Sequence, residues 1–359
     1  AGAIELPSFE EVARDKRAFI DMFHTFYRNN DPLTAQMLCQ QQDTRYLVQN
    51  PPAFPLNQRE LDALYEIGFE RAQHPFYEAL GPVKALETIR FSLTTHRGCY
   101  GECNFCSIAV HQGRTVRWRS EDSIVREAER LAQLPDFKGI IQDVGGPTAN
   151  MYGFECEKKL ARGSCADKRC LYPEICPQMD VDHGRQVALL RRLRQVEGVK
   201  KVFVASGVRY DLVLADQKHG ARYLRDVVRH HTSGQMKVAP EHTQDHVLHR
   251  MGKPGTAVLV RFRDLFTGLT RAARKEQYLT YYLIAAHPGC TEKDMRALKR
   301  FASRDLKINP RQVQIFTPTP STYSSLMYYT EMDPFTGEPL FVEKDLMRKE
   351  RQKSILVRK

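Results

Sequence analysis

The chain has 359 residues, of which 42% are hydrophobic and 27% are charged, a balance typical of a folded globular protein. Its 54 Lys and Arg against 43 Asp and Glu give a formal net charge of +11, a surplus that attracts polyanions such as nucleic acid. We find no run of about 18 apolar residues and no signal-peptide or transit-peptide pattern, so we expect a cytoplasmic protein with no membrane partner. Seven of its nine cysteines lie between Cys99 and Cys176, which favours metal or cluster ligands over disulfides.

The N-terminal lead, residues 1–85, carries no obvious chemistry, and its patterns predict a mainly helical segment. Phe9–Arg28 has apolar residues at helical spacing and Ser8 in the N-cap position. We expect a second helix over Leu33–Gln42, a short strand over Arg45–Gln49 and a third helix over Asn57–Gly68.

Strand and helix patterns alternate from Thr88 onward. Six strands are expected, over Ile89–Thr95, Gly139–Val144, Lys201–Ser206, Gln235–Ala239, Gln277–Ala285 and Gln312–Phe316. The helices expected among them are Ser120–Gln133, Asp182–Gln195, Ala221–His231, Gln244–Met251, Ala257–Lys275 and Glu292–Ser303. Six strands joined by helical crossovers predict a parallel sheet wound right-handedly. A closed eight-unit barrel needs two more units, so we expect an α/β fold with an open, partial (β/α)6 TIM-like barrel.

We place this barrel at residues 86–325, with a Cys-rich insertion at 152–180 and a basic extension at 326–359. Its functional face should be the C-terminal ends of the strands, where the motifs described next all fall.

Three cysteines, Cys99, Cys103 and Cys106, follow the first strand with the spacing C-x3-C-x2-C. A [4Fe–4S] cluster needs ligands at four iron corners, so three thiols leave one iron open to a small molecule. S-adenosylmethionine (SAM) can chelate such an iron through its amino and carboxylate groups, and Phe105 adds an aromatic ring against which adenine could pack.

Two other interpretations of this motif stay open. The thiols could be structural cysteines in a loop, or they could belong to a zinc site. Zinc needs a fourth Cys or His nearby, and His96 and His111 are present.

The motif resembles the radical SAM signature. Its context, RFSLTTHRGCYGECNFCSIAVHQGR followed by DFKGIIQDVGGPTANMYG, resembles the YgiQ-type radical SAM family. The resemblance implies a barrel of the radical SAM type, with a [4Fe–4S] cluster on Cys99, Cys103 and Cys106 and with SAM as a second cofactor. It also implies reductive cleavage of SAM to a 5′-deoxyadenosyl radical that abstracts hydrogen from substrate, with a flavodoxin- or ferredoxin-like electron donor. An additional N-terminal region precedes this point in that family, so we expect the chain to be its C-terminal portion.

The ends of strands two and three carry candidate SAM ligands. The resemblance implies that the turn at Gly145 and Gly146 receives the methionine amino group through backbone carbonyls; Pro147 stands where Glu is common, so only the backbone role transfers. The alternative is a tight turn. After strand three, Ser206 and Arg209 are candidates for the ribose and the carboxylate of SAM, because a guanidinium pairs with a carboxylate through two hydrogen bonds. The alternative is an Arg–Asp pair that stabilises the loop.

The ends of strands four and five carry further candidates. Lys237 and Glu241 are expected to line the pocket for SAM or substrate, or to form a buried structural pair. Residues 251–255 form a loop that could lie over the site. Gly289 lies in a turn that resembles the Pro-Gly-Glu-Thr turn of methylthiotransferase-like radical SAM enzymes, beside which adenine often packs. Cys290 replaces the Glu of that turn, either as a small core residue or as a reactive thiol.

A second cysteine group, Cys156, Cys165, Cys170 and Cys176, lies in the insertion. Four soft ligands in a loop poor in apolar residues predict a metal site, and we favour an iron–sulfur cluster over structural zinc; two disulfides are the third candidate. The surrounding basic residues, which we expect to lower the thiol pKa values, are Lys158, Lys159, Arg162, Lys168 and Arg169.

The C-terminal residues 344–359 are strongly basic. The basic residues there are Lys344, Arg348, Lys349, Arg351, Lys353, Arg358 and Lys359. They indicate either a solvated terminal helix or contact with RNA phosphates, which are recognised mainly by charge.

Three functions follow from these patterns. The first is a radical SAM enzyme whose substrate is unidentified, with RNA modification as one candidate. The second is a non-catalytic, metal-stabilised nucleic-acid-binding protein, and the third is a redox protein or cluster carrier.

Overall fold

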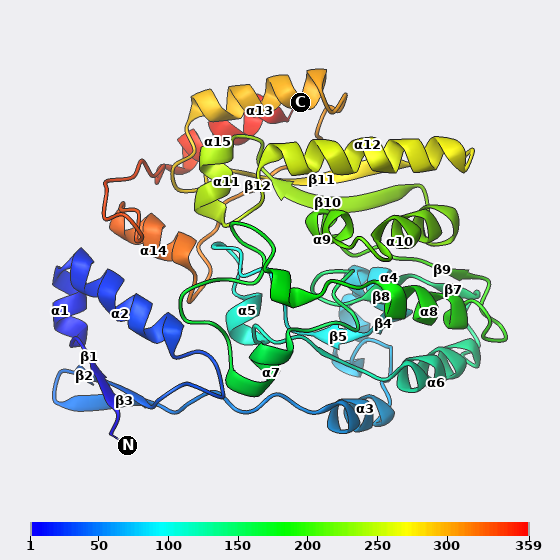
Figure 1. Ribbon diagram of the computed structural model, residues 1–359, viewed down its shortest axis with the longest axis horizontal. Helices are drawn as coiled ribbons and strands as arrows, with labels where there is room; N and C mark the ends of the chain where they lie inside the picture. The colour runs from blue at the N-terminus through cyan, green and yellow to red at the C-terminus, as the bar shows by residue number, and fades with distance from the viewer. Residues whose placement is uncertain (1, 358–359) are drawn as a thin grey trace.

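The computed structural model describes residues 2–357. The first part of the N-terminal lead forms a small three-stranded sheet with two helices. Strand β1 (Ile4–Leu6) pairs in parallel with β2 (Leu38–Gln42), which pairs antiparallel with β3 (Arg45–Gln49). Helices α1 (Phe9–Arg14) and α2 (Lys16–Arg28) connect β1 to β2. Figure 1 shows these elements at the left of the molecule, away from the long helices of the barrel.

Two expectations for the lead change. The predicted helix over 9–28 is interrupted at Asp15, whose carboxylate accepts the Arg17 N–H at 2.7 Å and caps α2. The predicted helix over 33–42 is wrong, because residues 38–42 form β2 instead. Pairing with both β1 and β3 satisfies the β2 backbone, and this long-range gain outweighs the local helical pattern. The Ser8 cap is confirmed, since its Oγ accepts the Glu11 N–H at 3.2 Å.

The rest of the lead runs along the outside of the barrel. Helix α3 (Gln58–Glu66) begins with a capping box between Asn57 and Glu60. The short helices η1 (Pro75–Leu80) and α4 (Lys84–Ile89) follow and lead into the first barrel strand.

The barrel strands pair in parallel and in sequence order. They are β4 (Ser92–Thr94), β7 (Ile140–Ile141), β8 (Asp143–Gly145), β9 (Lys201–Val202), β10 (Gln235–Glu241), β11 (Tyr278–Ala285) and β12 (Gln314–Ile315). The parallel pairs are β4 with β8, β7 with β9, β10 with β11, and β11 with β12. A parallel bridge between Val208 and Val238 connects the segment after β9 to β10.

β7 and β8 are two parts of one strand, separated by the single residue 142. The pairings therefore give six parallel strands, most of them shorter than expected. No ladder joins β12 to β4 among the residues described, so the barrel is open. The structure therefore confirms the partial (β/α)6 barrel.

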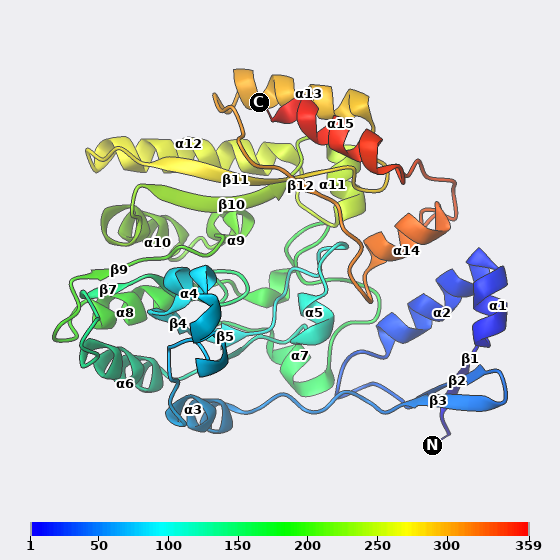
Figure 2. The same cartoon turned by 180° about the vertical axis from the view of Figure 1, so that it is seen from behind.

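Helices cover the outer face of the sheet (Figures 1 and 2). They are α6 (Glu121–Ala132), α8 (Gly184–Leu193), α9 (Tyr210–Ala215), α10 (Gly220–Asp226) with the π-helical turn η3 (Val227–His231), α11 (Asp245–Met251), α12 (Thr256–Ala272) and α13 (Glu292–Arg304). Ser120 caps α6, and Thr291 forms a capping box with Asp294 at α13. The apolar faces of these helices pack on Leu93, Ile141, Val202, Val238 and Leu283 of the strands.

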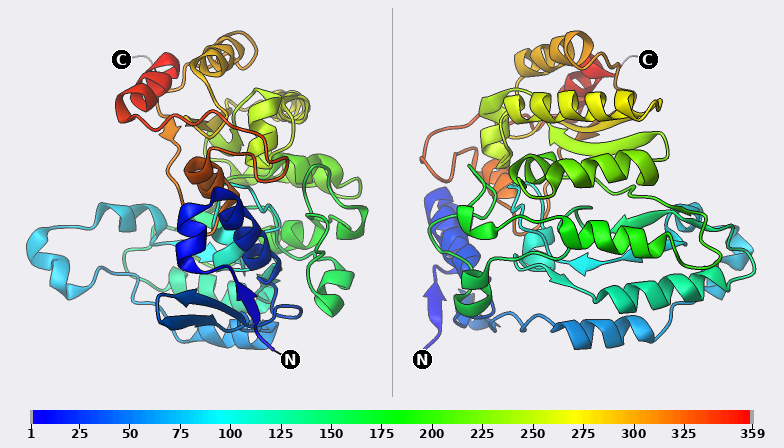
Figure 3. Two further views of the ribbon diagram at one scale, coloured as in Figure 1. Left: turned by 90° about the vertical axis from the view of Figure 1, so that its left-hand side faces the viewer. Right: turned by 45° about the vertical axis from the view of Figure 1, so that its right-hand side comes forward.

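Shorter elements surround the C-terminal ends of the strands. The pair β5 (His96–Arg97) and β6 (Arg117–Trp118) brackets the cysteine loop, which contains α5 (Ile108–His111). The insertion contains α7 (Glu157–Arg162) and η2 (Pro177–Met179). After the barrel, α14 (Tyr323–Thr330) lies next to α2, and α15 (Leu346–Leu356) packs against α13; Figure 3 shows both from two further sides. In residues 2–357, no helix has the length and apolarity to cross a membrane.

Candidate active site

The three thiols of the cysteine motif line one cavity of about 230 Å³ at the C-terminal ends of the barrel strands. We call it the thiol cavity. Its other walls come from the loop itself, the ends of β8, β9, β10 and β11, and the loop after α11: Phe105, Ile108, Pro147, Thr148, Gly207, Val208, Arg209, Tyr210, Ala239, Glu241, Tyr282, Lys253 and Pro254. Because parallel strands end at one edge of a sheet, segments far apart in the sequence meet around the thiols.

Asn104 fixes the cysteine loop to three distant segments. Its backbone N–H donates to the Met251 carbonyl at 2.9 Å, and its side-chain Nδ2 donates to the Arg250 carbonyl at 2.8 Å. Its own carbonyl accepts the Ser324 N–H at 2.8 Å, and its Oδ1 accepts from the Arg169 guanidinium at 2.7 Å. The loop is therefore held by α11, α14 and the insertion, so its geometry does not depend on a bound group alone.

Glu102 anchors the same loop to the lead. Its backbone is left-handed, with φ 43°, a conformation that is costly outside glycine. Its buried carboxylate lies 3.3 Å from Arg114 Nε and accepts from the Tyr27 hydroxyl of α2 at 3.2 Å. Burial, and then the Glu102 charge, raise the pKa of Tyr27, so this phenol stays a neutral donor.

Gly101 leaves room for a buried cation between two thiols. A Cβ at this position would lie 2.7 Å from Arg209 Nη1, 3.3 Å from Cys99 Sγ and 3.6 Å from Cys103 Sγ. With glycine there, Arg209 Nη1 approaches Cys103 Sγ to 3.6 Å. The guanidinium thus faces the thiols directly.

Two polar side chains orient Arg209. The carboxylate of Asp211 accepts from Arg209 Nε at 2.9 Å and from Nη2 at 2.8 Å, and both residues are buried. The Asn150 side chain hydrogen-bonds the Arg209 backbone and lies 3.1 Å from the His183 ring, which in turn contacts Asp216 at 2.7 Å. Burial opposes the charge of Arg209, but the charge and hydrogen bonds of Asp211 outweigh it and raise the pKa of this guanidinium, which stays charged.

Glu241 forms its ion pair with Lys253 and not with Lys237. The Glu241 Oε1 lies 3.9 Å from Lys253 Nζ, in the loop that follows α11, and both side chains are buried. Four residues along a strand span about 13 Å, so Lys237 and Glu241 share a face of β10 but do not meet. Burial raises the pKa of Glu241, whose backbone φ of 67° is also left-handed.

The glycine candidates are fixed by packing outside the cavity wall. A Cβ on Gly146 would lie 2.6 Å from His96 Nε2, and one on Gly145 would lie 3.3 Å from Ala149 Cα. From this turn, Pro147 and Thr148 line the thiol cavity instead, and Thr148 Oγ1 lies 3.7 Å from Cys99 Sγ.

The remaining candidates differ in their distance from the thiols. Phe105 lines the thiol cavity, and its carbonyl accepts from Thr319 Oγ1 at 2.8 Å. Ser206 donates its hydroxyl proton to Asp143, outside the cavity wall. Gly289, with φ 82°, packs where a Cβ would lie 2.6 Å from Arg250 Cδ. Cys290 is buried with its Sγ 3.6 Å from His242 Nε2, and burial raises its pKa to about 12.

The second cysteine group is divided by the structure. Cys156, Cys170 and Cys176 belong to one small apolar cluster with Tyr100 and Phe154, and Cys165 lies outside that cluster. All nine cysteines, each within the described residues, are free thiols.

Our expectation of lowered thiol pKa values in the insertion is wrong for Cys170. Burial raises its pKa to about 11, although Lys159 Nζ lies 3.8 Å from its sulfur. Lys159 is itself buried and paired with Glu155 at 2.8 Å, which reduces the field it exerts on the thiol.

The basic extension is a packed helix with its cations engaged. Lys344 pairs with Glu331, Arg348 with Glu343 at 3.0 Å and Arg351 with Glu292 at 2.9 Å, while Lys353 lies 3.7 Å from Glu350. Lys349 donates to the Tyr328 hydroxyl at 2.8 Å. The predicted basic residues Arg358 and Lys359 lie outside the described residues.

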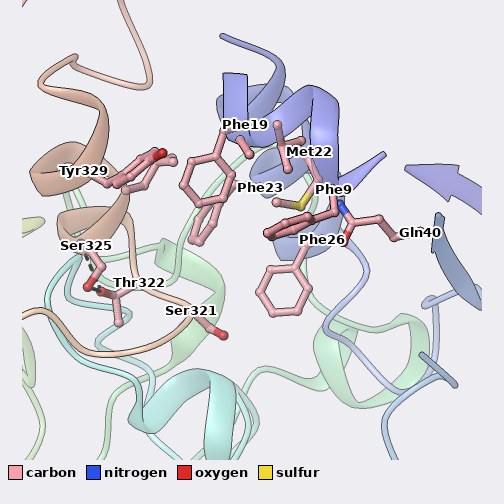
Figure 4. Close-up of a pocket in the computed structure, with 13 residues that line it drawn as sticks. Phe9, Phe19, Met22, Phe23, Phe26, Gln40, Ser321, Thr322, Ser325 and Tyr329 are labelled. Carbon is pink, nitrogen blue, oxygen red and sulfur yellow. Dashed lines mark hydrogen bonds between the residues drawn. The ribbon is translucent and has the colours of Figure 1, made fainter. Parts of the chain in front are cut away.

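A different cavity, of about 590 Å³, lies between α1, α2 and α14 (Figure 4). Phe9, Phe19, Phe23, Phe26 and Tyr329 form much of its wall, and the described residues that line it include no thiol and no charged group. Its apolar walls supply no group for acid–base or redox chemistry, so the candidate active site is the thiol cavity.

Sequence reasoning missed the residues that hold the thiol cavity in shape. Asn104 and Asn150 carry no pattern of their own, although each lies inside a segment that we singled out. Arg169 is adjacent to Cys170 and was interpreted only as part of the basic surroundings of the second cysteine group.

Comparison with known proteins places the chain among longer relatives. A family model described as "Radical SAM N-terminal" matches residues 1–92. A UPF0313 protein of Fusobacterium nucleatum is 56% identical over 356 residues, which cover 99% of this chain and 63% of that protein. A UPF0313 protein of Methanosarcina mazei is 47% identical over 353 residues, which cover 98% of this chain and 55% of that protein. The chain thus spans about three fifths of these relatives' length.

Two solved structures align over most of the chain at low identity. The radical S-adenosylmethionine methyltransferase TsrM from Kitasatospora setae aligns with a TM-score of 0.44 and 15% identity, covering 81% of this chain and 49% of TsrM. The cobalamin-dependent S-adenosylmethionine radical enzyme OxsB aligns with a TM-score of 0.45 and 14% identity, covering 84% and 37%. The first quarter of the chain matches a radical SAM family model, and nearly the whole chain matches UPF0313 proteins, which fits the YgiQ-type radical SAM resemblance.

Proposed function

We propose that the protein is a radical SAM enzyme in which Cys99, Cys103 and Cys106 hold a [4Fe–4S] cluster. The observation that carries the proposal is the thiol cavity itself, where these three thiols and the buried cation Arg209 meet at the C-terminal edge of a parallel barrel. The radical SAM family model that matches residues 1–92 supports the same reaction class.

The residues present fit the cluster better than they fit a single metal ion. Among residues 2–357, no three Cys, His, Asp or Glu side chains converge closely enough to hold one ion. A zinc ion needs ligands within about 2.3 Å of a single point, whereas a four-iron cluster takes its thiolates at separate corners. Three soft donors around one cavity, with a glycine at Gly101 where a Cβ would obstruct them, match the second requirement.

When bound, the reduced cluster would supply one electron that cleaves SAM into methionine and a 5′-deoxyadenosyl radical, which abstracts hydrogen from the substrate. The chain itself must first provide thiolates. Burial raises the pKa of Cys99, and raises that of Cys106 to about 11, so these two thiols must lose their protons when they bind a cluster. Arg209 lies next to these sulfurs and offsets the negative charge that appears when they deprotonate.

The other walls of the thiol cavity position SAM in this proposal. Thr148 presents its hydroxyl beside Cys99, and Phe105 provides an aromatic ring for the adenine. The Glu241–Lys253 pair sits at the boundary of the thiol cavity and offers one acceptor and one donor to polar groups of SAM. Gly145, Gly146, Ser206 and Gly289 do not line the thiol cavity.

The substrate, the electron donor of flavodoxin or ferredoxin type and a second metal group in the insertion stay predictions. An RNA substrate also stays a prediction, as does the alternative of a non-catalytic nucleic-acid-binding protein. Both relied on the net charge of +11 and on the basic tail, and the tail cations that the structure describes are paired or hydrogen-bonded within the chain. Cys165 does not join the other three thiols of the insertion, so a second metal group has no part in the proposed reaction.

Iron and sulfide analysis with electron paramagnetic resonance tests the proposal. After anaerobic reconstitution we expect about four irons at the Cys99–Cys106 site. We also expect the spectrum of the reduced protein to change on addition of SAM, because SAM binds the iron that lacks a thiolate. Cys103→Ser should lose this SAM-dependent change, whereas Cys39→Ser, in β2, should keep it. Zinc in place of iron, or a spectrum indifferent to SAM, would contradict the proposal.

A further inference from the structure

A larger cavity adjoins the thiol cavity inside the barrel. Its volume is about 850 Å³, and it runs along the inner faces of β10, β11 and β12 from Gln235 to Glu241. The two cavities share Ala239, Glu241 and Tyr282 in their walls. A molecule in this larger cavity, which we call the bore, would therefore border directly on whatever occupies the thiol cavity.

Alternation along the strands determines which side chains face the bore. On β10, Gln235, Lys237, Ala239 and Glu241 line it, every second residue, while Met236 and Val238 are buried in the core on the other face. The register pairs Lys237 with Thr280 of β11, and Thr280 also lines the bore. Lysine is rarely found inside a protein without a partner, so Lys237 on the inner face of a barrel strand indicates a role in binding.

The charges in the bore are unbalanced. Lys237 comes from β10, and Arg311 comes from the loop before β12. Within residues 2–357, neither cation has a carboxylate within 4.0 Å. The one carboxylate among the lining residues described, Glu241, lies at the far end and faces Lys253. A bound anion would therefore meet two cations and no free negative charge.

The rest of the wall is uncharged and mixes apolar residues with polar ones. Its polar members are the amides and hydroxyls of Gln235, Thr280, Tyr282, Asn309, Gln312 and Gln314. Pockets of about 300–1,000 Å³ hold small molecules, so the volume of about 850 Å³ matches a ligand of that class. These lining residues are complementary to a small polar molecule that carries an anionic group at one end.

We propose that the substrate is a small polar metabolite whose carboxylate or phosphate binds between Lys237 and Arg311, and whose remaining polar groups extend past Tyr282 toward the thiol cavity. This inference rests on the proposed function, since it places the substrate beside bound SAM. Carboxylate and phosphate share the chemistry that a lysine and an arginine recognise, and the experiment distinguishes them.

Labelling with pyridoxal 5′-phosphate tests the anion site on the reconstituted protein. This probe combines an anionic phosphate with an aldehyde that condenses with a lysine amine, and borohydride then fixes the adduct for mass spectrometry. We expect preferential labelling of Lys237, and pyridoxal, which lacks the phosphate, should label this lysine about fivefold less. Arg311→Gln should reduce labelling by a similar factor and Arg311→Lys should restore most of it, which excludes unfolding as the cause.

Arg300→Gln, on the exposed side of α13, is the matched control and should leave Lys237 labelling unchanged. Protection by inorganic phosphate would assign a phosphate-bearing substrate, and protection by succinate would assign a carboxylate. Protection by neither anion, equal labelling by the two aldehydes, or protection only by an oligouridylate would overturn the proposal.

Formation of 5′-deoxyadenosine, measured on the same preparation, separates the two claims. If SAM is cleaved but Lys237 labelling is indifferent to Arg311, the anion site is wrong and the proposed function stands. If labelling follows Arg311 but SAM is not cleaved, the proposed function is wrong, and so is the assignment of the anion as its substrate.

Discussion

The side chain of Asn150 spans both backbone polar groups of Arg209. Its Oδ1 accepts the Arg209 N–H at 2.7 Å, and its Nδ2 donates to the Arg209 carbonyl at 3.0 Å. Both contacts are buried, and His183 and Asp216 continue the network behind them. The position of the guanidinium beside Cys103 is thus set by a residue that follows a different strand.

Asn150→Ala should destabilise the fold and disorder this corner of the site. Removing the side chain leaves the buried N–H of Arg209 unpaired and its carbonyl with only the 3.5 Å bond from the Val213 N–H, which costs about 2–3 kcal/mol of unfolding free energy. Denaturant unfolding measures the loss. Asn57→Ala removes an exposed helix cap at α3 and should cost only about 1 kcal/mol, so an equal effect of the two changes would contradict the role of Asn150.

Gly101→Ala should impair cluster assembly more than stability. The new Cβ would lie 2.7 Å from Arg209 Nη1 and must displace the guanidinium from the two thiols. We expect the iron retained per chain after reconstitution to fall by at least about twofold, because the thiolate charge is then less well balanced. Gly268→Ala, in α12 where nothing lies within 4 Å of the added Cβ, should keep full iron content. Full iron content in Gly101→Ala would show that Arg209 can move without consequence.

Arg169→Ala should loosen the cysteine loop. The Arg169 guanidinium donates to Asn104 Oδ1 at 2.7 Å and to the Glu102 carbonyl at 3.1 Å, so it ties the insertion to the loop. Hydrogen exchange of peptides covering 99–106 should speed up, by a factor of about ten for a loss of about 1.4 kcal/mol. Lys168→Ala, at the exposed neighbouring position, serves as the control and should leave that exchange unchanged.

The free energy of unfolding should fall as the pH decreases from about 6.5 toward 4. Burial lowers the pKa of His231 and of His242 to about 4 each, so the folded protein keeps both rings neutral while the unfolded chain protonates them. The unfolded state then binds more protons, and stability is lost by roughly 1.4 kcal/mol per pH unit for each ring across this interval.

Denaturant unfolding at pH 7, 6 and 5 measures this slope. His231 has its Nδ1 2.8 Å from the Val202 carbonyl and its Nε2 3.8 Å from Asp226. His231→Gln keeps a hydrogen-bond donor in this position but removes the titrating ring. The unfolding free energy of this variant should therefore change less with pH, by the equivalent of about one proton taken up on unfolding. An unchanged slope would mean that His231 is protonated in the folded state.

Local signals explain why most of the barrel could be predicted from the sequence. Ser120 before α6 and Thr291 before α13 cap their own helices, and both helices begin within one residue of where we expect them. The strand β2 could not be recognised in this way, because its conformation depends on pairing with β1 more than thirty residues earlier. Long-range pairing leaves little trace in the local pattern of a five-residue segment.

The three cysteines of the site could be predicted from the sequence, but the residues that hold them in position could not. The spacing of Cys99, Cys103 and Cys106 directly indicated that they act together, and they share one cavity. The partner of Glu241 was not predictable, because Lys253 approaches from a loop whose path depends on the packing of α11. Buried amides such as Asn150 resemble ordinary loop residues until the segments that they join are placed side by side.

Formation of 5′-deoxyadenosine is the most direct test of the central claim. The reconstituted protein is reduced under anaerobic conditions with SAM, and the nucleoside is quantified by chromatography and mass spectrometry. Our account predicts 5′-deoxyadenosine from the wild-type chain and from Cys39→Ser, but only background amounts from Cys103→Ser. A wild-type protein that contains its iron yet forms no 5′-deoxyadenosine, or a Cys103→Ser variant as active as the wild type, would contradict it.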